Sequence, residues 1–118
     1  MNDTQRQIAR KLVELLLEPG YMLSLWGGTW YTLCNSTNID DVLAAVEQLD
    51  GFVSIEIDLI HQAGQHEPYL GKIDLAYPTT QPSIGITYDV KPAIEPAIES
   101  IVDQIKDFAD SLLAEEAA

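Results

Sequence analysis

The side chains of this sequence that could do chemistry are mostly carboxylates, and near the C-terminal end they recur with helical spacing. Within residues 92–113, Glu99, Asp103 and Asp107 follow one another every four residues, and Asp110 lies beside them. This spacing places a carboxylate about every 6 Å along one side of a helix. Like charges so placed destabilise a helix by about 0.3 kcal/mol per pair. The row therefore indicates a surface for a basic partner; the alternative is an ordinary solvated helix face.

The net charge of the chain also favours a basic partner. Nineteen acidic and six basic side chains give −13, and residues 1–34, with three of each sign, contribute nothing to it. The whole excess lies in residues 35–118. A charge of this sign and size disfavours direct binding to nucleic acid or to an anionic membrane. It favours a basic protein partner, and the alternative is that the chain is simply acidic.

A second set of carboxylates lies on predicted strands. A strand of duplex DNA carries one phosphate per about 3.4 Å of axis, so the helical row is too sparse to imitate it unaided. Glu56, Asp58, Asp74 and Asp89 alternate with apolar residues. They are expected to point outward to solvent from the uncovered face of a sheet. Together the two sets predict an acidic, nucleic-acid-like surface.

An aromatic pair lies in a predicted hairpin around Gly27-Gly28. In a two-residue turn, Trp26 faces Thr29 and Leu25 faces Trp30, with Leu23, Leu25 and Trp30 toward the core. Trp26 and Tyr31 then share the opposite face, where rigid aromatic side chains are typical anchors of protein interfaces. The alternative is that another helix covers that face.

The sequence offers little support for metal binding, for catalysis or for a reactive thiol. His61 and His66 flank Ala63-Gly64 in a predicted loop, so they are expected to be surface histidines and not metal ligands. Outward carboxylates such as Glu56 and Asp74 lack the cleft that would separate their pKa values, and no serine has the context of a nucleophile. Cys34 has no basic neighbour and is expected to be a buried thiol. No catalytic residue, metal site or cofactor is predicted.

The elements that position these residues follow from the apolar patterning. Helices are expected over residues 4–18 (capped by Thr4 or Asp3), 39–49 and 92–113, because apolar residues recur there at steps of three and four. Alternating runs predict strands at 21–26, 29–34, 52–60, 70–77 and 83–90. The order α-β-β-α-β-β-β-α predicts one α+β domain over residues 1–118, with a five-stranded, mostly antiparallel sheet and helices packed on one face. No apolar run approaches the ~20 residues of a membrane span, and the single cysteine and N-terminus favour the cytoplasm.

Six short motifs occur along the chain: Gly20-Tyr21, LSLWGGTW at 23–30, Asn35-Ser36-Thr37-Asn38, DGFVSIEI at 50–57, LGKIDLAY at 70–77 and Thr87-Tyr88-Asp89. Together they resemble a family of small, uncharacterised proteins found in bacteriophage and prophage genomes. The chain differs from that family in having Pro78-Thr79-Thr80 where a Gly-Asn turn is usual, and Tyr88-Asp89 where Asp-Tyr is usual. The resemblance implies a dispensable phage accessory protein in a bacterial cytoplasm, and it assigns no functional residue.

These observations predict a non-enzymatic, acidic phage-type protein that covers the nucleic-acid-binding surface of a host protein, as an anti-defence inhibitor would. Its partner-binding residues are expected to be the two acidic sets with Trp26 and Tyr31. Two alternatives stay open. One is a small acidic chaperone or adaptor that binds a client by strand addition, and the other is a domain that acts as a homodimer.

Overall fold

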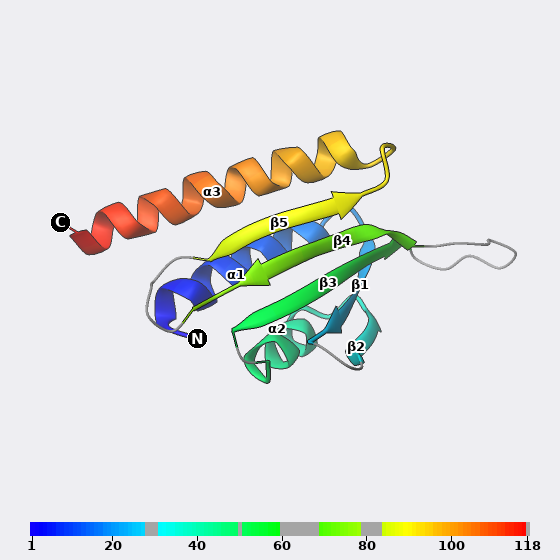
Figure 1. Ribbon diagram of the computed structural model, residues 1–118, viewed down its shortest axis with the longest axis horizontal. Helices are drawn as coiled ribbons and strands as arrows, with labels where there is room; N and C mark the ends of the chain where they lie inside the picture. The colour runs from blue at the N-terminus through cyan, green and yellow to red at the C-terminus, as the bar shows by residue number, and fades with distance from the viewer. Residues whose placement is uncertain (28–30, 50, 60–68, 79–83, 118) are drawn as a thin grey trace, which may run out of the picture.

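The computed structural model describes residues 1–27, 31–49, 51–59, 69–78 and 84–117, and the account below concerns these residues. The element order is the predicted α-β-β-α-β-β-β-α, with one five-stranded antiparallel sheet (Figure 1). The helices are α1 (Asp3–Leu17), α2 (Ile39–Glu47) and α3 (Glu95–Ala117). The strands are β1 (Tyr21–Trp26), β2 (Tyr31–Ser36), β3 (Phe52–Leu59), β4 (Tyr69–Ala76) and β5 (Gly85–Val90).

The N-terminus of α1 is capped by Asn2 and not by the predicted Thr4 or Asp3. The Asn2 side chain accepts a hydrogen bond from the Gln5 backbone N–H at 2.8 Å, and the Gln5 side chain accepts one from the Asn2 N–H at 3.1 Å. This reciprocal arrangement satisfies two N–H groups that the helix leaves unpaired. The predicted cap residues, Thr4 and Asp3, are instead part of the helix, and Thr4 is buried.

The sheet has the strand order β2-β1-β3-β4-β5, with β3 at its centre. Leu25 pairs with Ile55 on β3, which pairs in turn with Ile73 on β4, and all three side chains are fully buried. The predicted alternation is confirmed on these strands, because the apolar set of each strand points to one side. That side forms the core with the helices.

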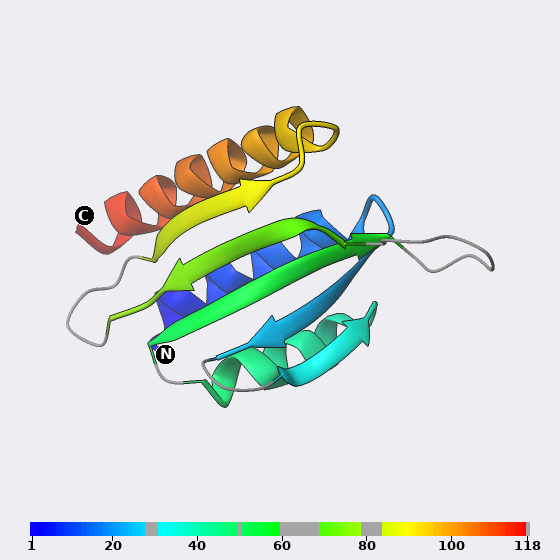
Figure 2. The same cartoon turned by 45° about the vertical axis from the view of Figure 1, so that its right-hand side comes forward.

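Side chains from all three helices join the strands in a single apolar cluster. α1 and α2 lie behind the sheet in Figure 1, and α3 lies beside the end strand β5. Figure 2 shows the same layering from a second direction. The cluster includes Ile8 and Leu12 from α1, Val46 from α2, and Ile98 and Ile105 from α3. Burial of these side chains is the main force that fixes the helices on the sheet.

The hairpin of β1 and β2 has a different register from the predicted one. Trp26 pairs with Tyr31, and Leu25 pairs with Leu33, so the predicted partners Thr29 and Trp30 are wrong. Two register shifts along this pair, of the kind that β-bulges produce, move the residues of β2 past their expected positions. Gly28, Thr29 and Trp30 lie outside the described residues, as do His61 and His66.

Cys34 is exposed, which contradicts the expected buried thiol. It lies on β2, an end strand of the sheet, which pairs with β1 alone within the part of the chain that the structure describes. A strand in that position buries fewer of its side chains than a central strand does.

α3 begins at Glu95, with Pro96 in its first turn, and continues past the predicted end at Leu113. Proline is tolerated in this turn because the first N–H groups of a helix have no partner within it. Within the described residues, no helix combines the length and the apolar character that crossing a membrane requires.

Candidate functional site

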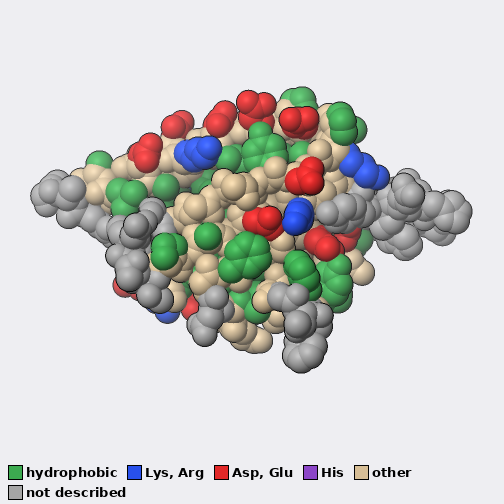
Figure 3. Space-filling view, viewed as in Figure 1, with side chains coloured by type: hydrophobic (Ala, Val, Ile, Leu, Met, Phe, Trp, Pro, Cys, Tyr) green, Lys and Arg blue, Asp and Glu red, His purple; other side chains and the backbone are tan. Residues whose placement is uncertain are grey.

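The exposed side of α3 carries the first acidic set, which we name the α3 ridge. All its members are exposed, whereas Ile98 and Ile105 on the opposite side of the helix are fully buried. Figure 3 shows acidic side chains in a row along the edge of the molecule that α3 forms. The helical period therefore places these carboxylates on one continuous surface. The α3 ridge consists of Glu95, Glu99, Asp103, Asp107 and Asp110.

The bases of α1 do not neutralise the α3 ridge. Arg6 forms ion pairs with Asp3 at 3.0 Å and with Glu47 of α2 at 2.7 Å. Arg10 pairs with Glu14 at 3.3 Å, one turn further along α1. Among the described residues, no ion pair joins a base of α1 to a carboxylate of α3. The ridge therefore keeps its charge toward solvent.

The α3 ridge lies close to β5, and its negative charges act on Tyr88 of that strand. Partial burial, followed by the negative charges of Glu99, Glu95 and Asp103, raises the pKa of the Tyr88 hydroxyl. A negative charge disfavours a nearby phenolate, and the effect falls off with distance. Three members of the ridge are thus near the end strand of the sheet.

The second acidic set lies on the side of the sheet that faces the viewer in Figures 1 and 3, which we name the open sheet face. Lys72 of β4 is paired across the strands with Glu56 of β3 on one side and with Asp89 of β5 on the other. Its Nζ nevertheless lies nearest to Asp74, on its own strand, with an N–O distance of 3.6 Å. The register thus brings Glu56, Asp74 and Asp89 around one lysine, as predicted from the alternation.

The exposure of this set differs from the prediction. Asp58 was expected to be in solvent but is only 8% exposed, and Ser54, which is paired with Asp74 across the strands, is 1% exposed. The Ser54 hydroxyl donates a hydrogen bond to Asp74, which therefore has two partners, Ser54 and Lys72. Asp74 is accordingly less available to a partner protein than Asp89, which is exposed. Alternation gave the correct face, but neighbouring side chains on that face determine the exposure.

Asp58 is the carboxylate most affected by its surroundings. It lies on the same face as Glu56, two residues along β3. Burial, and secondly the charge of Glu56, raise the pKa of the Asp58 carboxyl. Both effects penalise its ionised form. Asp58 is therefore less available for an ion pair with a partner protein than an exposed carboxylate is.

The predicted aromatic anchors, Trp26 and Tyr31, lie on the same face of the sheet as the second acidic set. The Tyr31 hydroxyl donates to both carboxylate oxygens of Glu56, at 2.7 and 2.9 Å, so the β2 side chain reaches across β1. This hydrogen bond, then burial and the Glu56 charge, raise the pKa of Tyr31 to about 12. Tyr31 is 48% exposed and Trp26, its cross-strand partner, is half-buried. Tyr31 is therefore the more accessible of the two predicted anchors.

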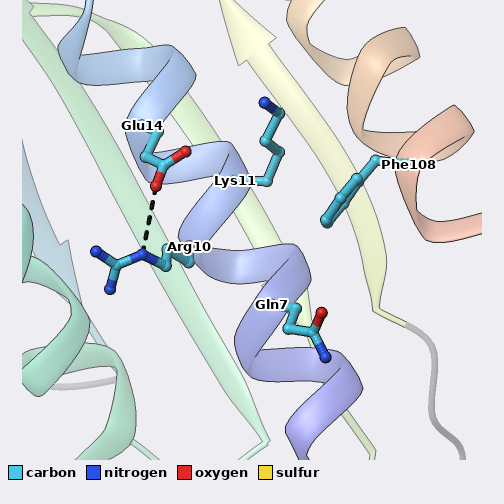
Figure 4. Close-up of a pocket in the computed structure, with 5 residues that line it drawn as sticks. All are labelled: Gln7, Arg10, Lys11, Glu14 and Phe108. Carbon is cyan, nitrogen blue, oxygen red and sulfur yellow. Dashed lines mark ion pairs between the residues drawn. The ribbon is translucent and has the colours of Figure 1, made fainter. Parts of the chain in front are cut away.

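A shallow groove between α1 and α3 was not expected from the sequence. Its volume is about 200 Å³, and Figure 4 shows Lys11 and Phe108 reaching toward the space between the two helices. The Arg10 guanidinium points to Glu14 and away from Phe108. The only signal in the sequence was the polar spacing of Gln7, Arg10, Lys11 and Glu14 on one side of α1. The groove contains both signs of charge and lies apart from the α3 ridge.

The structure thus brings together the α3 ridge and the open sheet face, on either side of β5. Within the described ranges, no three or more His, Cys, Asp or Glu side chains are grouped as metal ligands would be. The chain was also compared with known proteins. No family model matches it, and no match was found among curated proteins or solved structures.

Proposed function

We propose that this protein is a non-enzymatic binding protein that covers a basic, nucleic-acid-binding surface of a host protein. It would act in a bacterial cytoplasm as a phage-type accessory protein, and its expected target is a defence or regulatory complex. The α3 ridge and the open sheet face form the contact surface. Tyr31, with Trp26 beside it, supplies the apolar anchor.

The observation that carries this proposal is the row of exposed carboxylates along α3, which Lys106 alone among the residues of this helix offsets. The members at every fourth position repel one another, and this repulsion destabilises the helix without stabilising another part of the chain. Exposed charges of one sign steer an oppositely charged partner and accelerate association. A basic groove that normally holds phosphates offers the matching charge.

The second acidic set widens the charged surface beyond the single line of carboxylates along α3. One helix provides a single line of charge, whereas a duplex presents two phosphate strands. Glu56 and Asp89 on the open sheet face supply charge on the other side of β5 from α3. A partner that binds a duplex would thus meet acidic groups on both sides of β5.

The test compares two variants of equal net charge in capture from a bacterial lysate. The first neutralises the ridge with Glu99→Gln, Asp103→Asn and Asp107→Asn. The second, matched control neutralises three exposed carboxylates elsewhere, with Glu18→Gln, Asp40→Asn and Asp41→Asn. We expect the wild type and the control, but not the ridge variant, to capture a nucleic-acid-binding protein at about 50 mM salt and to lose it near 500 mM.

The captured protein is then assayed for nucleic-acid binding in the presence of this chain. Occlusion predicts competition, with the wild type and the control displacing the nucleic acid and the ridge variant failing to do so. Equal capture by all three proteins, or capture that is insensitive to salt, would contradict the proposal.

A further inference from the structure

The end strand β5 has a free backbone edge. Among the described residues, the strand order ends at β5, and β4 is its only strand partner. The Lys91 N–H donates to the Leu70 carbonyl at 2.8 Å, which identifies a hydrogen-bonded pair at that position. Because such pairs alternate along an antiparallel ladder, the N–H and C=O groups of Ile86, Tyr88 and Val90 point away from β4. None of these groups is bonded to a described residue.

The core is also incompletely covered at this edge. Ile73 and Leu75 on β4 are almost fully buried, whereas their β5 neighbours Tyr88 and Ile86 are only half-buried. Val90 is half-buried as well. A further strand beside β5 would bury these side chains and pair the free backbone groups.

The other end of the sheet is a poorer template. The pairing of β2 with β1 contains two register shifts, and Asn35 near its end has a φ of +51°. The pairing of β5 with β4 contains no shift from Gly71–Val90 to Ala76–Gly85. Irregular strands resist the addition of another strand, and regular ones permit it.

Charge decides which strand would fit. Glu95, Glu99 and Asp103 are near Tyr88 on the helix side of β5, and Asp89 is exposed on the other side. A second copy of β5 would bring a second α3 ridge against the first, which like charges oppose. A lysine-rich strand would instead lay its alkyl stems on these half-buried apolar residues and direct its ammonium groups toward the ridge.

We propose that β5 accepts an extended, basic segment of the partner as a sixth strand, with alternate Lys or Arg side chains directed toward the α3 ridge. This inference rests on the proposed function and names the recognised structure within the partner. Backbone hydrogen bonds supply the affinity, and the alternation of charge supplies the specificity.

The test uses the intact protein and a synthetic peptide of about ten residues in which Lys and Thr alternate, a length that covers one strand. Amide hydrogen exchange is followed by NMR. On addition of the peptide we expect exchange at Ile86, Tyr88 and Val90 to slow by about tenfold or more, because these N–H groups become hydrogen-bonded. The same peptide with alternate backbone nitrogens methylated keeps its charge, and it should not slow the exchange.

Two variants of equal charge locate the peptide. Glu99→Gln with Asp103→Asn should weaken peptide binding by about tenfold, because two partly exposed charge pairs are lost. Asp40→Asn with Asp41→Asn, on α2, should leave it unchanged.

The outcomes separate the two proposals. Peptide binding without slowed exchange at the β5 amides would overturn strand addition and leave the acidic contact surface standing. At about 50 mM salt, protection of these amides in the free protein that increases with protein concentration would show pairing with a second copy, and would also overturn it. Failure of lysate capture in the charge-matched comparison would reject the proposed function itself.

Discussion

The α3 ridge should make the protein less stable than it could be, and replacing Asp103 with Lys measures this. Asp103 has like-charged residues four positions away on both sides, Glu99 and Asp107. Each repulsion costs about 0.3 kcal/mol, and each attraction contributes about the same. Asp103→Lys removes two repulsions and creates two attractions, but it also exchanges the attraction to Lys106, three residues on, for a repulsion. The free energy of unfolding should therefore rise by about 0.6 kcal/mol at low salt.

For a chain of this size, such a gain raises the melting temperature by about 2.5 °C. Circular dichroism melts at low salt and in about 1 M NaCl measure it, and the difference should nearly vanish at high salt because exposed charges are screened. The same substitution brings a positive charge near Tyr88 and should lower the pKa of its hydroxyl.

Asp110→Lys is the matched control on the same exposed side of α3. Asp110 follows Lys106 by four residues and Asp107 by three. The substitution therefore exchanges one attraction for a repulsion and one repulsion for an attraction, and its net effect should be close to zero. An unchanged melting temperature for Asp103→Lys, or a rise that persists in high salt, would refute the reasoning that the ridge is a row of mutually repelling charges.

Three further predictions concern the sheet. The raised pKa of Asp58 means that the folded state binds more protons than the unfolded state between the two pKa values, so stability falls as pH rises through that window. Asp58→Asn should raise the urea midpoint at pH 7 relative to wild type and flatten its dependence on pH; a lower midpoint would contradict this. Glu56→Gln should move the pKa of Tyr31 from about 12 toward its ordinary value, followed by NMR of the tyrosine ring, and no shift would exclude the hydrogen bond as its cause. Gly71→Ala should cost about 3 kcal/mol or more in chemical denaturation, because φ is +142° and the added Cβ would lie 2.4 Å from the Val90 Cα; a tolerated alanine would exclude this packing of β5 on β4.

The parts of the fold that the sequence predicts well are those in which one strong pattern determines the outcome. On β3, strict alternation assigns Val53, Ile55 and Ile57 to one side, and all three are fully buried. A slip of one residue would expose the whole apolar set, so little freedom is left. On α3, the same argument with a period of 3.6 places the ridge opposite the buried stripe.

The parts that the sequence does not predict depend on contacts between elements. The β1–β2 register depends on bulges, which leave no mark in the pattern of apolar residues. The burial of Ser54 and the two partners of Asp74 follow from which β4 residues lie opposite β3, and the pattern of one strand contains no such information. The acidic ridge was therefore predictable residue by residue, whereas the exposure of the open sheet face was not.

The free edge of β5 raises the question of why the protein would not aggregate through it. Natural sheets protect an end strand with lysine, proline, bulges or a covering segment. The sequence of β5, GITYDV, contains no proline or lysine, and its pairing with β4 is regular. The α3 ridge beside it is the remaining protection, since pairing two copies through β5 would bring two rows of carboxylates together.

This protection should depend on salt. At about 50 mM NaCl, repulsion between the ridges acts over more than 10 Å, and we expect sedimentation equilibrium to show a monomer. Near 1 M NaCl the range falls to about 3 Å, and self-association should appear, with slowed hydrogen exchange at the β5 amides. Asp103→Lys should associate at lower salt than the wild type, because it removes charge from the ridge, whereas Asp40→Lys on α2 should not. A dimer that forms at low salt and dissociates at high salt would mean that opposite charges hold the copies together, and the ridge could not then be what keeps β5 open for a basic strand.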